Sequence, residues 1–587
     1  MSLITARIDF SDPHDRAAPR LRRAFGTPQS ILVARTPDEV RPVLDAVQAA
    51  AAQGAWCVGY LRYEAAPAFD TALAVHEADG PLAWFAVHDE ALPWPPTSPA
   101  TGPDAGVQVQ WQPGLERPAF DEALGTLQKA ITDGAYYQVN FTAQMTGLLL
   151  PGQEAAPAQV LFGALQRAQP GGYAAFLDTG DEQLLSVSPE LFFDWRNGEL
   201  LTRPMKGTAP RGSTPESDAA HADALRTSVK ERAENVMVVD LLRNDLSRIA
   251  EPFSVHVPRL FHTEPLPAVW QMTSDVQART RPGCSLADVF AALFPCGSIT
   301  GAPKVRAMQA IRSLEAGPRG VYCGAIGVVQ PGGAATFNVP IRTVSLRGAQ
   351  ARCGIGSGIT SGSVAGGEWQ EWRHKQAFLA RASEPFDILE TLALDAGRLR
   401  HREDHLARMA ASAAHFGHRW DAAQARACLQ ALAQGHPQGL WRVRLLLSAG
   451  GQFTAQAYAM EPSPPEVRLQ LAGNPLDAMH GEFVRFKTTR RAHYDAFTPT
   501  APDVFDSVLW NAQGEITECT RGNIAMRVDG RWVTPPLACG LLPGVGRALA
   551  LREGRLTEAV VRVDALAAVE AWAFVNSLRG WIDATLV

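Results

Sequence analysis

Lysine is scarce in this chain of 587 residues: 54 residues are Lys or Arg, and only six of these are Lys. A chain that uses Arg wherever a positive charge suffices keeps Lys where a primary amine is needed, because a guanidinium is neither readily deprotonated nor nucleophilic. The six are Lys129, Lys206, Lys230, Lys304, Lys375 and Lys487. We interpret Lys129 as a surface residue of a helix, whereas the other five fall inside dense motifs.

Other absences exclude whole classes of protein. The formal net charge is −6 and no segment is polybasic, which argues against binding to nucleic acid or to an anionic membrane. No apolar run approaches the roughly 20 residues that span a bilayer, and the first residues are acidic where a secretory signal would be apolar. Eight cysteines occur without a CxxC pair, which argues against zinc and against a disulfide framework. These absences predict a cytoplasmic protein.

The chain does contain enough apolar side chains for large cores, because 46% of its residues are apolar and 19% are charged. Its length exceeds the roughly 150 residues of a common domain, so we expect at least two domains. A change of pattern at RASEPFD predicts a boundary between residues 1–380 and residues 381–587. Both parts mix strand-like runs with helical segments and turn signals, which predicts an α+β or α/β fold class.

Two pairs of acidic residues recur in predicted helices. Glu231 and Glu234 are three residues apart and share a face. Glu368 and Glu371 repeat this spacing, with Lys375 four residues farther on. Such a face is usually solvated, but two pairs that meet across a cleft would suit a hard divalent ion such as Mg²⁺. The spacing alone leaves both interpretations open.

Two glycine-rich segments offer backbone donors to an anion. FPCGSITGAPKVRAM runs from a loop into a helix predicted to begin near Pro303, and RCGIGSGITSG is the second segment. Either could instead be a tight turn, and neither matches a nucleotide-binding motif in context. Arg342, in the strand-like run NVPIRTV, is a candidate to bind a substrate carboxylate through two hydrogen bonds.

The first part of the chain resembles the chorismate-utilising enzymes over residues 1–380. The resemblance lies, in chain order, in SVSPELFF, TRPMKGTAPRG, KERAENVMVVDLLRNDLSR, FPCGSITGAPKVRAM, RGVYCGAIG, FNVPIRTV, GIGSGITS and EWQEWRHK. It implies a β-sandwich with helices and chorismate as the substrate. The Mg²⁺ ligands that it implies are Glu234 and Glu371, with Glu368 and Glu231 beside them. The substrate contacts that it implies are Thr208, Thr300, Tyr322, Arg342, Gly354, Gly356, Gly358 and Lys375.

Lys206 indicates one branch of this family. Anthranilate-forming members have a small residue at this position, whereas members that aminate chorismate at carbon 4 have Lys, as in PMKGT here. A Lys amine can attack carbon 2 of the ring and displace the 4-hydroxyl, after which ammonia attacks carbon 4 and expels the Lys. Deprotonating a free Lys at pH 7 costs about 4–5 kcal/mol, so the site must lower its pKa by burial or by nearby positive charge. Glu190 matches the family residue that assists departure of the hydroxyl as a general acid. The anthranilate reaction is the alternative.

Gln271 stands where many relatives have His, in AVWQMTSDV. Because Gln exchanges no proton near neutrality, we interpret it as a hydrogen-bonding residue, consistent with amination at carbon 4. No cysteine has Gly at both the −2 and the +2 position, so the chain lacks the nucleophile elbow of a glutaminase. We therefore expect ammonia from a separate glutamine amidotransferase subunit or from solution.

The second part contains a single Lys, Lys487 in VRFKTTRRAHYD. With HLARMAASAAHFG, GEITECTRGNIAM, LLPGVGR and AFVNSLRG, this segment resembles the fold-type IV pyridoxal-phosphate enzymes over residues 385–587. The resemblance implies a two-subdomain fold, a homodimer, and pyridoxal 5'-phosphate held by Lys487 as a Schiff base, with Glu518 paired to the pyridine nitrogen. The phosphate contacts that it implies are Arg408, the backbone at Val545 and Gly546, and Ser577, while Asn523 would shape the loop after Glu518.

Together the two resemblances predict synthesis of 4-aminobenzoate, the folate precursor. The first domain would make 4-amino-4-deoxychorismate from chorismate and ammonia. The second would use Lys487 to remove the proton at carbon 4 and would eliminate pyruvate, which leaves an aromatic ring. Two alternatives for the second domain stay open: a branched-chain or D-amino-acid aminotransferase, and a non-catalytic dimerisation module.

Overall fold

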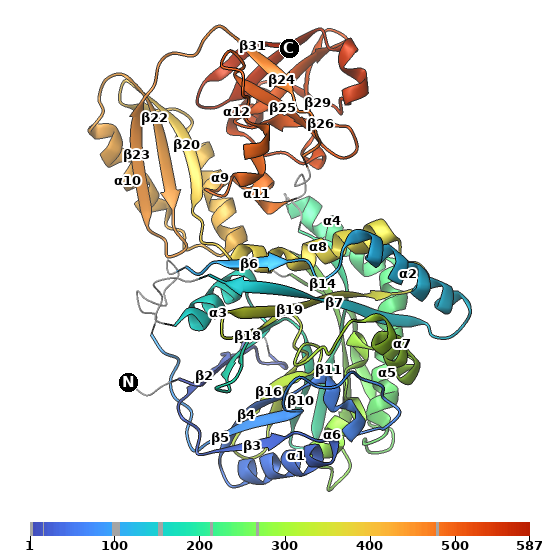
Figure 1. The fold of residues 1–587 in the computed structure, drawn as a ribbon. Coiled ribbons are helices and arrows are strands. Elements are labelled where there is room, and N and C mark those ends of the chain that lie inside the picture. The colour runs from blue at the N-terminus through green and yellow to red at the C-terminus, as the bar shows by residue number, and fades with distance from the viewer. Residues whose placement is uncertain are drawn as a thin grey trace. The chain divides into compact units, whose positions relative to one another are not determined.

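The computed structural model describes residues 4–15, 17–96, 106–150, 156–211, 215–265, 269–476 and 481–587. The chain forms two compact units, Met1–Pro385 and Phe386–Val587 (Figure 1). The boundary follows helix α8 (Ala365–Ala382), so the boundary predicted after residue 380 lies inside the last turn of that helix.

Two antiparallel sheets form the centre of the first unit. Nine described strands make sheet I, in the order β15 (Gly301–Ala302), β7 (Gln138–Leu149), β19 (Gln350–Ile359), β18 (Thr343–Arg347), β9 (Gln183–Ser188), β8 (Tyr173–Asp178), β1 (Ala6–Phe10) and β2 (Leu21–Phe25), with β6 (Val109–Gln112) beside β7. Ten described strands make sheet II, in the order β12 (Met205–Pro210), β14 (Val269–Arg279), β11 (Glu199–Arg203), β10 (Leu191–Arg196), β17 (Ala335–Asn338), β16 (Ala325–Val329), β4 (Trp56–Leu61), β5 (Ala83–His88) and β3 (Ser30–Ala34), with β13 (His256–Pro265) beside β14.

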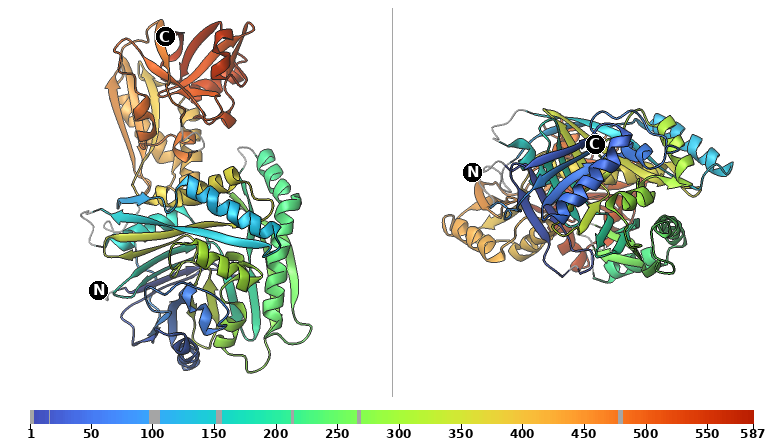
Figure 2. Two further views of the ribbon diagram at one scale, coloured as in Figure 1. Left: turned by 45° about the vertical axis from the view of Figure 1, so that its right-hand side comes forward. Right: turned by 90° about the horizontal axis from the view of Figure 1, so that it is seen from below.

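The two sheets pack face to face, and helices cover their outer faces. Apolar side chains of both sheets, among them Ile8, Tyr60 and Ile326, share one buried core between the sheets. The helices that pack on sheet II are α1 (Pro37–Ala52), α5 (Val229–Ser247) and α6 (Leu286–Leu293). Those on sheet I are α2 (Arg117–Thr132), α3 (Pro157–Ala168) and α8 (Figures 1 and 2). The expected β-sandwich with helices is confirmed.

Two further helices of the first unit bear on its site. Helix α7 (Lys304–Leu314) begins after Pro303, as predicted, and contributes to the cores on both sheets. Helix α4 (Pro215–Thr227) precedes α5, whose first turn is capped by Ser228 accepting a hydrogen bond from the Glu231 backbone. This cap fixes where the α5 acids stand along the helix.

The second unit has two subdomains, as predicted. In the smaller one, described strands pair in the order β21 (Arg398–Leu399), β20 (Ile388–Asp395), β22 (Leu440–Leu447) and β23 (Phe453–Ala459), and α9 (Arg402–Phe416) and α10 (Ala422–Gln434) share their core. The larger one pairs β26 (Ile516–Cys519), β25 (Asp506–Trp510), β24 (Glu466–Leu471), β31 (Gly580–Leu586), β30 (Ala571–Asn576), β27 (Asn523–Val528), β28 (Arg531–Thr534) and β29 (Thr557–Glu558). The short helix α11 (Glu482–Arg485) precedes Lys487, and the short helix α12 (Val545–Arg552) begins after Gly544.

None of the helices in the described ranges is long and apolar enough to cross a membrane. All eight cysteines are free thiols, and most of them are buried.

Two candidate active sites

Lys206 lies at an irregular point of an edge strand. The register of β12 on β14 shifts between Met205 and Thr208, and Gly207 between them has φ +93°. Such an irregularity lets a strand re-aim a side chain that would otherwise follow the pleat. The amine points toward sheet I, because a Cβ atom placed on Gly358 of β19 would lie 2.8 Å from Lys206 Nζ. The two sheets therefore meet at this amine.

The segment from Gly354 to Gly358 is a strand and not the predicted loop. It forms part of β19, which pairs with β7 over ten residues. Glycine alternates along it because one face is crowded: a Cβ on Gly354 would lie 2.2 Å from the Tyr322 ring, and one on Gly356 would lie 2.4 Å from the Phe141 carbonyl oxygen. The missing side chains let Tyr322 and Lys206 approach the sheet.

Glu190 is a buried acid beside this amine. It is 3% exposed, and Ser298 Oγ donates a 2.7 Å hydrogen bond to its Oε1. Burial raises the pKa of Glu190 to about 7, although the Ser298 hydrogen bond and the Lys206 charge pull it down. A carboxyl with this pKa can give and take a proton near neutrality, which is what a general acid needs.

The acids of α5 and α8 lie within electrostatic reach of one another and of Lys206. Glu231 Oε2 would lie 2.9 Å from a Cβ on Gly207, so it lies against the backbone next to the lysine. Burial raises the pKa values of Glu231 and Glu234, and their repulsion by Glu368 on α8 adds to this, while Lys206 lowers both. The acids of the two helices thus repel one another electrostatically, and the charge of Lys206 counteracts this repulsion.

The chemistry of these acids fits Mg²⁺, although no closed coordination shell is formed. No group of three or more His, Cys, Asp or Glu side chains in the described residues converges as metal ligands. Glu368 accepts hydrogen bonds from Ser357 Oγ at 2.6 Å and Ser363 Oγ at 2.7 Å. Mg²⁺ commonly takes one or two carboxylates and completes its shell with water and substrate oxygens, so the mutually repelling acids suit it.

Lys375 and Arg342 join α8 to the edge of sheet I. Lys375 Nζ pairs with Glu371 at 2.7 Å and donates to the Gly356 carbonyl oxygen at 2.8 Å. Burial lowers the pKa of Lys375, and burial also lowers that of Arg342, whose guanidinium donates to the Lys375 carbonyl. For Glu371, burial would raise the pKa, but the charge of Lys375 outweighs it and the pKa falls. Arg342 is not within a strand: it precedes β18 with φ +53°.

The other predicted substrate residues lie around this point. Thr300 is fully buried, and its Oγ1 donates to the Cys296 carbonyl at 3.1 Å. Thr208 Oγ1 donates to Gln271 Oε1 at 3.1 Å, and Gln271 Nε2 donates to the Gly207 carbonyl at 2.8 Å. Gln271 is therefore a hydrogen-bonding residue, and it fastens the bulge that carries Lys206.

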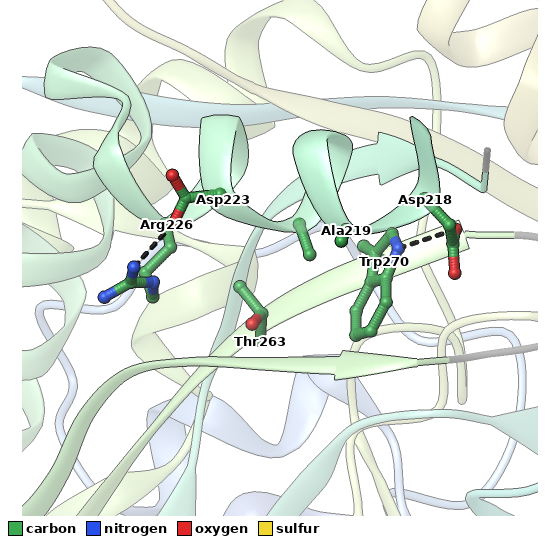
Figure 3. A pocket seen from close by; sticks show the side chains of 7 residues that line it. Asp218, Ala219, Asp223, Arg226, Thr263 and Trp270 are labelled. Atoms are coloured by element: carbon green, nitrogen blue, oxygen red, sulfur yellow. Dashed lines mark hydrogen bonds and ion pairs between the residues drawn. The ribbon is translucent and has the colours of Figure 1, made fainter. Parts of the chain in front are cut away.

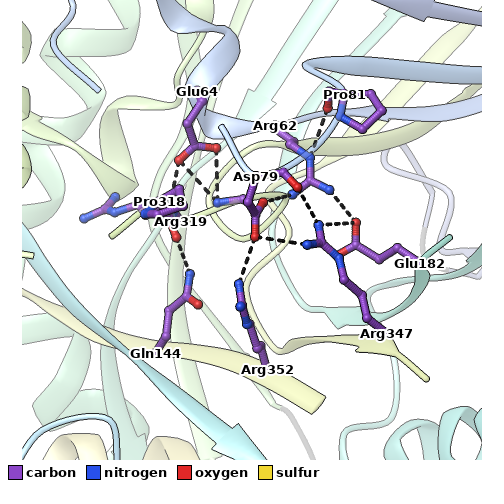
Figure 4. Close-up of polar contacts among 11 residues, drawn as sticks. Arg62, Glu64, Asp79, Pro81, Gln144, Glu182, Pro318, Arg319, Arg347 and Arg352 are labelled. Atoms are coloured by element: carbon purple, nitrogen blue, oxygen red, sulfur yellow. Dashed lines mark hydrogen bonds and ion pairs between the residues drawn. The ribbon is translucent and has the colours of Figure 1, made fainter. Parts of the chain in front are cut away.

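A polar network absent from our sequence predictions has a buried centre (Figure 4) and joins strand β7 to the segment before Thr300. Arg319 is 4% exposed and donates to the carbonyl oxygens of Ile299 and Asn140, at 2.8 and 2.7 Å, and to Glu315 at 2.7 Å. The other members are Arg62, Glu64, Asp79, Glu182, Arg347 and Arg352. Two charged residues four apart in LEAGPRG, between apolar runs, were the available signal for Glu315 and Arg319.

A separate cavity of about 410 Å³ lies between α4 and strands β13 and β14 (Figure 3). Its wall includes Asp218, Arg226, Thr263 and Trp270, and Trp270 Nε1 donates to Asp218 at 2.9 Å. The lining residues include no predicted substrate residue. This cavity is therefore distinct from the cluster around Lys206.

In the second unit, Lys487 follows α11 and pairs with the first strand of the smaller subdomain. Its carbonyl oxygen accepts a 2.9 Å hydrogen bond from the Leu389 backbone. Burial lowers the pKa of the Lys487 amine to about 7, and the positive charges of Arg491 and Arg408 add to this. An amine with this pKa is about half neutral at pH 7 and can bond to a carbonyl carbon.

Glu518 lies on β26, within the electrostatic reach of Lys487. Tyr494 Oη donates to its Oε1 at 2.7 Å, and the Leu542 backbone donates to its Oε2 at 3.0 Å. Burial raises the pKa of Glu518 to about 7 despite both hydrogen bonds. A buried, oriented carboxylate of this kind fits a pyridinium nitrogen, which would supply the missing positive charge.

The predicted phosphate residues meet at the N-terminus of α12. No side chain caps this helix, which begins at Val545 after Gly544. A Cβ on Gly546 would lie 2.8 Å from the Ser577 backbone nitrogen. The start of α12 and the loop that contains Ser577 can therefore be in contact only because residue 546 is glycine. Asn523, predicted to shape the loop after Glu518, donates to the Leu542 carbonyl at 2.9 Å and so holds the loop before α12. Uncapped backbone donors at a helix start fit a phosphate group.

Arg408 lies beside this helix start but is already held by a partner that we did not predict. Its guanidinium donates to both oxygens of Glu390, at 2.8 and 2.7 Å, and to the Pro543 carbonyl at 3.1 Å. Burial would raise the pKa of Glu390, but Arg408 and the hydrogen bond with His405 lower it to about 2. A carboxylate in the middle of the apolar strand ILETLAL was the signal for Glu390. It fixes the guanidinium next to the proposed phosphate position.

Comparisons with known proteins show which protein families the two units match. Residues 20–381 match the family model described as chorismate binding enzyme, and residues 387–587 match the model described as amino-transferase class IV. Aminodeoxychorismate synthase component 1 of Klebsiella aerogenes is 41% identical over 261 residues, which are 44% of this chain and 57% of that protein. Anthranilate synthase component 1 3 of Haloarcula marismortui is 36% identical over 284 residues, 48% of this chain and 55% of that protein.

These alignments thus span little more than half the length of either relative. The crystal structure of anthranilate synthase component I from Streptococcus pneumoniae TIGR4 matches 64% of this chain and 90% of its own, with a TM-score of 0.51 and 24% identity. That likeness shows the fold of the first unit. The chain belongs to the family of chorismate-binding enzymes and carries an amino-transferase class IV domain after its chorismate-binding domain.

Proposed function

We propose that this chain makes 4-aminobenzoate in two steps, as an aminodeoxychorismate synthase joined to an aminodeoxychorismate lyase. The observation on which this depends most is the placement of Lys206. Its amine lies against Gly358 of the glycine strand, and its charge acts on the buried acid Glu190, whose pKa is about 7, and on the carboxylates of α5 and α8. An amine so placed suits a nucleophile that needs an acid beside it for the leaving group.

In the first step, the lone pair of Lys206 Nζ forms a bond to carbon 2 of chorismate. The ring double bonds shift, the bond between carbon 4 and the hydroxyl oxygen breaks, and Glu190 donates the proton that makes the hydroxyl leave as water. Ammonia then forms a bond to carbon 4, the double bonds shift back, and Lys206 leaves with its electron pair. The sum is chorismate plus ammonia giving 4-amino-4-deoxychorismate plus water.

Around this chemistry, other residues bind and orient the substrate. Arg342 and Lys375 would bind carboxylate groups of chorismate, and the Tyr322 ring would pack beside the dihydro ring. Glu234 and Glu371, with Glu231 and Glu368 beside them, would hold Mg²⁺, which neutralises a substrate carboxylate when bound. Thr300 and the strand Gly354–Gly358 would bound the space and exclude water.

In the second unit, Lys487 would bind pyridoxal 5'-phosphate and then take the proton from carbon 4 of aminodeoxychorismate. The cofactor supplies a sink for the electron pair that this leaves. Glu518 would hold the pyridine nitrogen in its protonated form, and Arg408, Ser577 and the start of α12 would hold the phosphate. Loss of the enolpyruvyl group as pyruvate leaves the aromatic ring of 4-aminobenzoate. Ammonia from a separate glutamine amidotransferase, and a homodimer formed through the second unit, are part of the proposal.

The test is to identify the products. The chain is given chorismate, ammonium, Mg²⁺ and pyridoxal 5'-phosphate, and products are separated by chromatography and identified by mass. We expect 4-aminobenzoate and pyruvate in equal amounts. Anthranilate would instead favour the alternative reaction of the first unit, and aminodeoxychorismate without an aromatic product would exclude the lyase step.

The pH dependence of the first step tests the role of Glu190. The step needs Glu190 protonated and Lys206 neutral, so its rate declines on the alkaline side as Glu190, with its pKa of about 7, loses its proton. In Glu190→Gln the amide has no proton to give, so we expect the rate to fall by roughly 10²–10⁴-fold. The alkaline decline should also disappear, because the acid that loses its proton near pH 7 is then absent. The measurement is the rate of covalent adduct formation with chorismate in the absence of ammonia, followed by intact-protein mass spectrometry.

Glu64 provides a matched control for this change. Burial raises its pKa to about 7 as well, but it accepts hydrogen bonds from the Arg319 and Gly320 backbone, away from Lys206. Glu64→Gln should therefore keep the alkaline decline. A Glu190→Gln protein with wild-type rate and profile would contradict the assignment.

A further inference from the structure

Gln138 is a buried amide without a hydrogen-bond partner. It begins strand β7, is 1% exposed, and neither its Oε1 nor its Nε2 has a partner in the structure. Leaving a buried polar group unpaired is unfavourable, and nearly all such groups in folded proteins are paired. The two unpaired atoms of Gln138 therefore leave one donor and one acceptor available to a ligand or a neighbouring side chain.

The amide faces the amine of Lys206. A Cβ atom placed on Gly358 would lie 2.7 Å from Gln138 Nε2 and 2.8 Å from Lys206 Nζ, so the two nitrogen atoms are at most 5.5 Å apart. Glycine at position 358 leaves this space to the two side chains. The groups whose charges act on Lys206 at the same point are Glu190 beside β10, Glu231 and Glu234 on α5, and Glu371 and Lys375 on α8.

The backbone of Gln138 cannot move to relieve the unpaired amide. Residues 138 and 139 pair with Ala302 and Gly301 of β15 on one side. The Gln138 carbonyl oxygen lies so close to Gly301 that a Cβ there would be 2.1 Å from it. Strand β19 pairs with β7 on the other side, with Ile359 opposite Val139. The main chain that carries the amide is therefore held in place on both sides.

We propose that Gln138 is a positioning residue for the nucleophile of the first unit. A half-turn of the amide about the Cγ–Cδ bond exchanges Nε2, which faces Lys206 in the structure, with Oε1. The amide oxygen then accepts a hydrogen bond from the neutral Lys206 amine, which turns the nitrogen lone pair toward carbon 2, and the amide nitrogen donates to an oxygen of the bound substrate. An amide suits this role because it is uncharged at every working pH, whereas a carboxylate there would stabilise the ammonium form and remove the lone pair. The inference rests on the proposed function of Lys206.

Gln138 assists the step in which Lys206 bonds to carbon 2 and the 4-hydroxyl leaves. Lys206 Nζ keeps both protons and becomes positively charged on bonding to carbon 2. The electrons of the broken bond leave with the 4-hydroxyl oxygen, which takes a proton from Glu190 and departs as water. Gln138 gains and loses no proton. Its substitution should therefore change the rate of adduct formation without changing the product.

The test compares Gln138→Glu and Gln138→Met with the wild type in adduct formation from chorismate without ammonia, by intact-protein mass spectrometry. In Gln138→Glu the new carboxylate places a negative charge beside the amine and favours its protonated form, which has no lone pair, so the acidic limb of the rate profile should move to higher pH. In Gln138→Met the limb should stay in place while the rate falls about tenfold, as for one lost hydrogen bond. Chorismate affinity, from intrinsic fluorescence, should change less than the rate in both variants.

Gln144 gives the matched control on the same strand. Its Nε2 already donates to the Pro318 carbonyl at 2.5 Å, so Gln144→Glu makes the same chemical change away from Lys206 and should leave the profile unmoved. Thermal unfolding shows whether each variant is folded. An unmoved profile in Gln138→Glu together with a wild-type rate in Gln138→Met would overturn the role of Gln138 alone. A wild-type protein that forms no adduct at Lys206 would overturn this role together with the proposed function.

Discussion

Replacing Lys206 with alanine should abolish the amination of chorismate, with a fall of roughly 10³-fold or more, as for the loss of other catalytic nucleophiles. The alanine side chain cannot form the bond to carbon 2, and the acid and the substrate contacts around it have no other nucleophile to assist. Lys206→Arg should be as inactive, because a guanidinium stays protonated near neutrality. The measurement is the rate of aminodeoxychorismate formation at saturating ammonium, with the lyase step monitored separately through added aminodeoxychorismate.

Two controls make this result specific. Lys129 lies exposed on α2, and Lys129→Ala should keep the wild-type rate. The Lys206→Ala protein should still convert added aminodeoxychorismate to 4-aminobenzoate, since that reaction belongs to the second unit. Amination by Lys206→Ala within a few-fold of the wild type would refute covalent catalysis and favour direct attack by ammonia.

Replacing Lys487 with alanine should remove the lyase activity, again by roughly 10³-fold or more, and should also remove the visible absorbance that the wild type gains with pyridoxal 5'-phosphate. Both effects have one cause, since no other lysine occurs after residue 375. Chorismate and ammonium should then yield aminodeoxychorismate that accumulates without pyruvate. Product chromatography and absorbance after gel filtration measure the two effects independently.

The same amine predicts how cofactor capture depends on pH. Because burial and neighbouring arginines lower the pKa of Lys487 to about 7, the neutral amine is already abundant at pH 7, and the capture rate should rise through pH 7 and then level off. An amine with the usual pKa near 10.4 would give a rate that still rises at pH 9. A wild-type protein that gains no absorbance at all would instead favour the non-catalytic dimerisation module.

Helices that carry acids were predictable from the sequence because their signal is local. The three-residue spacing of Glu231 and Glu234, and of Glu368 and Glu371, places each pair on one helical face, as the structure has it. Pro303 likewise marks the start of α7. In each case the residues that decide the structure lie within one or two turns of one another.

The glycine strand and the buried partners could not be predicted in the same way. Repeated glycine in GIGSG favours a loop by composition, and only the distant Tyr322, Phe141 and Lys206 explain why a strand carries it. The pairing of Glu390 with Arg408 depends on a helix that packs on a strand, and that of Arg319 with Asn140 spans 179 residues. Such contacts are set by the tertiary fold, and no local pattern in the sequence encodes them.

Arg319 limits how the first unit can diverge. Its guanidinium neutralises a buried acid and at the same time supplies donors to main-chain oxygens on two separate walls of the site. Replacing Arg319 would leave the Glu315 carboxylate buried without its positive partner. It would also remove the hydrogen bonds to both main-chain oxygens. Substitutions of side chains around the proposed chorismate site can therefore change substrate preference at a lower cost in stability than substitutions of Arg319. Relatives that catalyse a different reaction should retain this arginine.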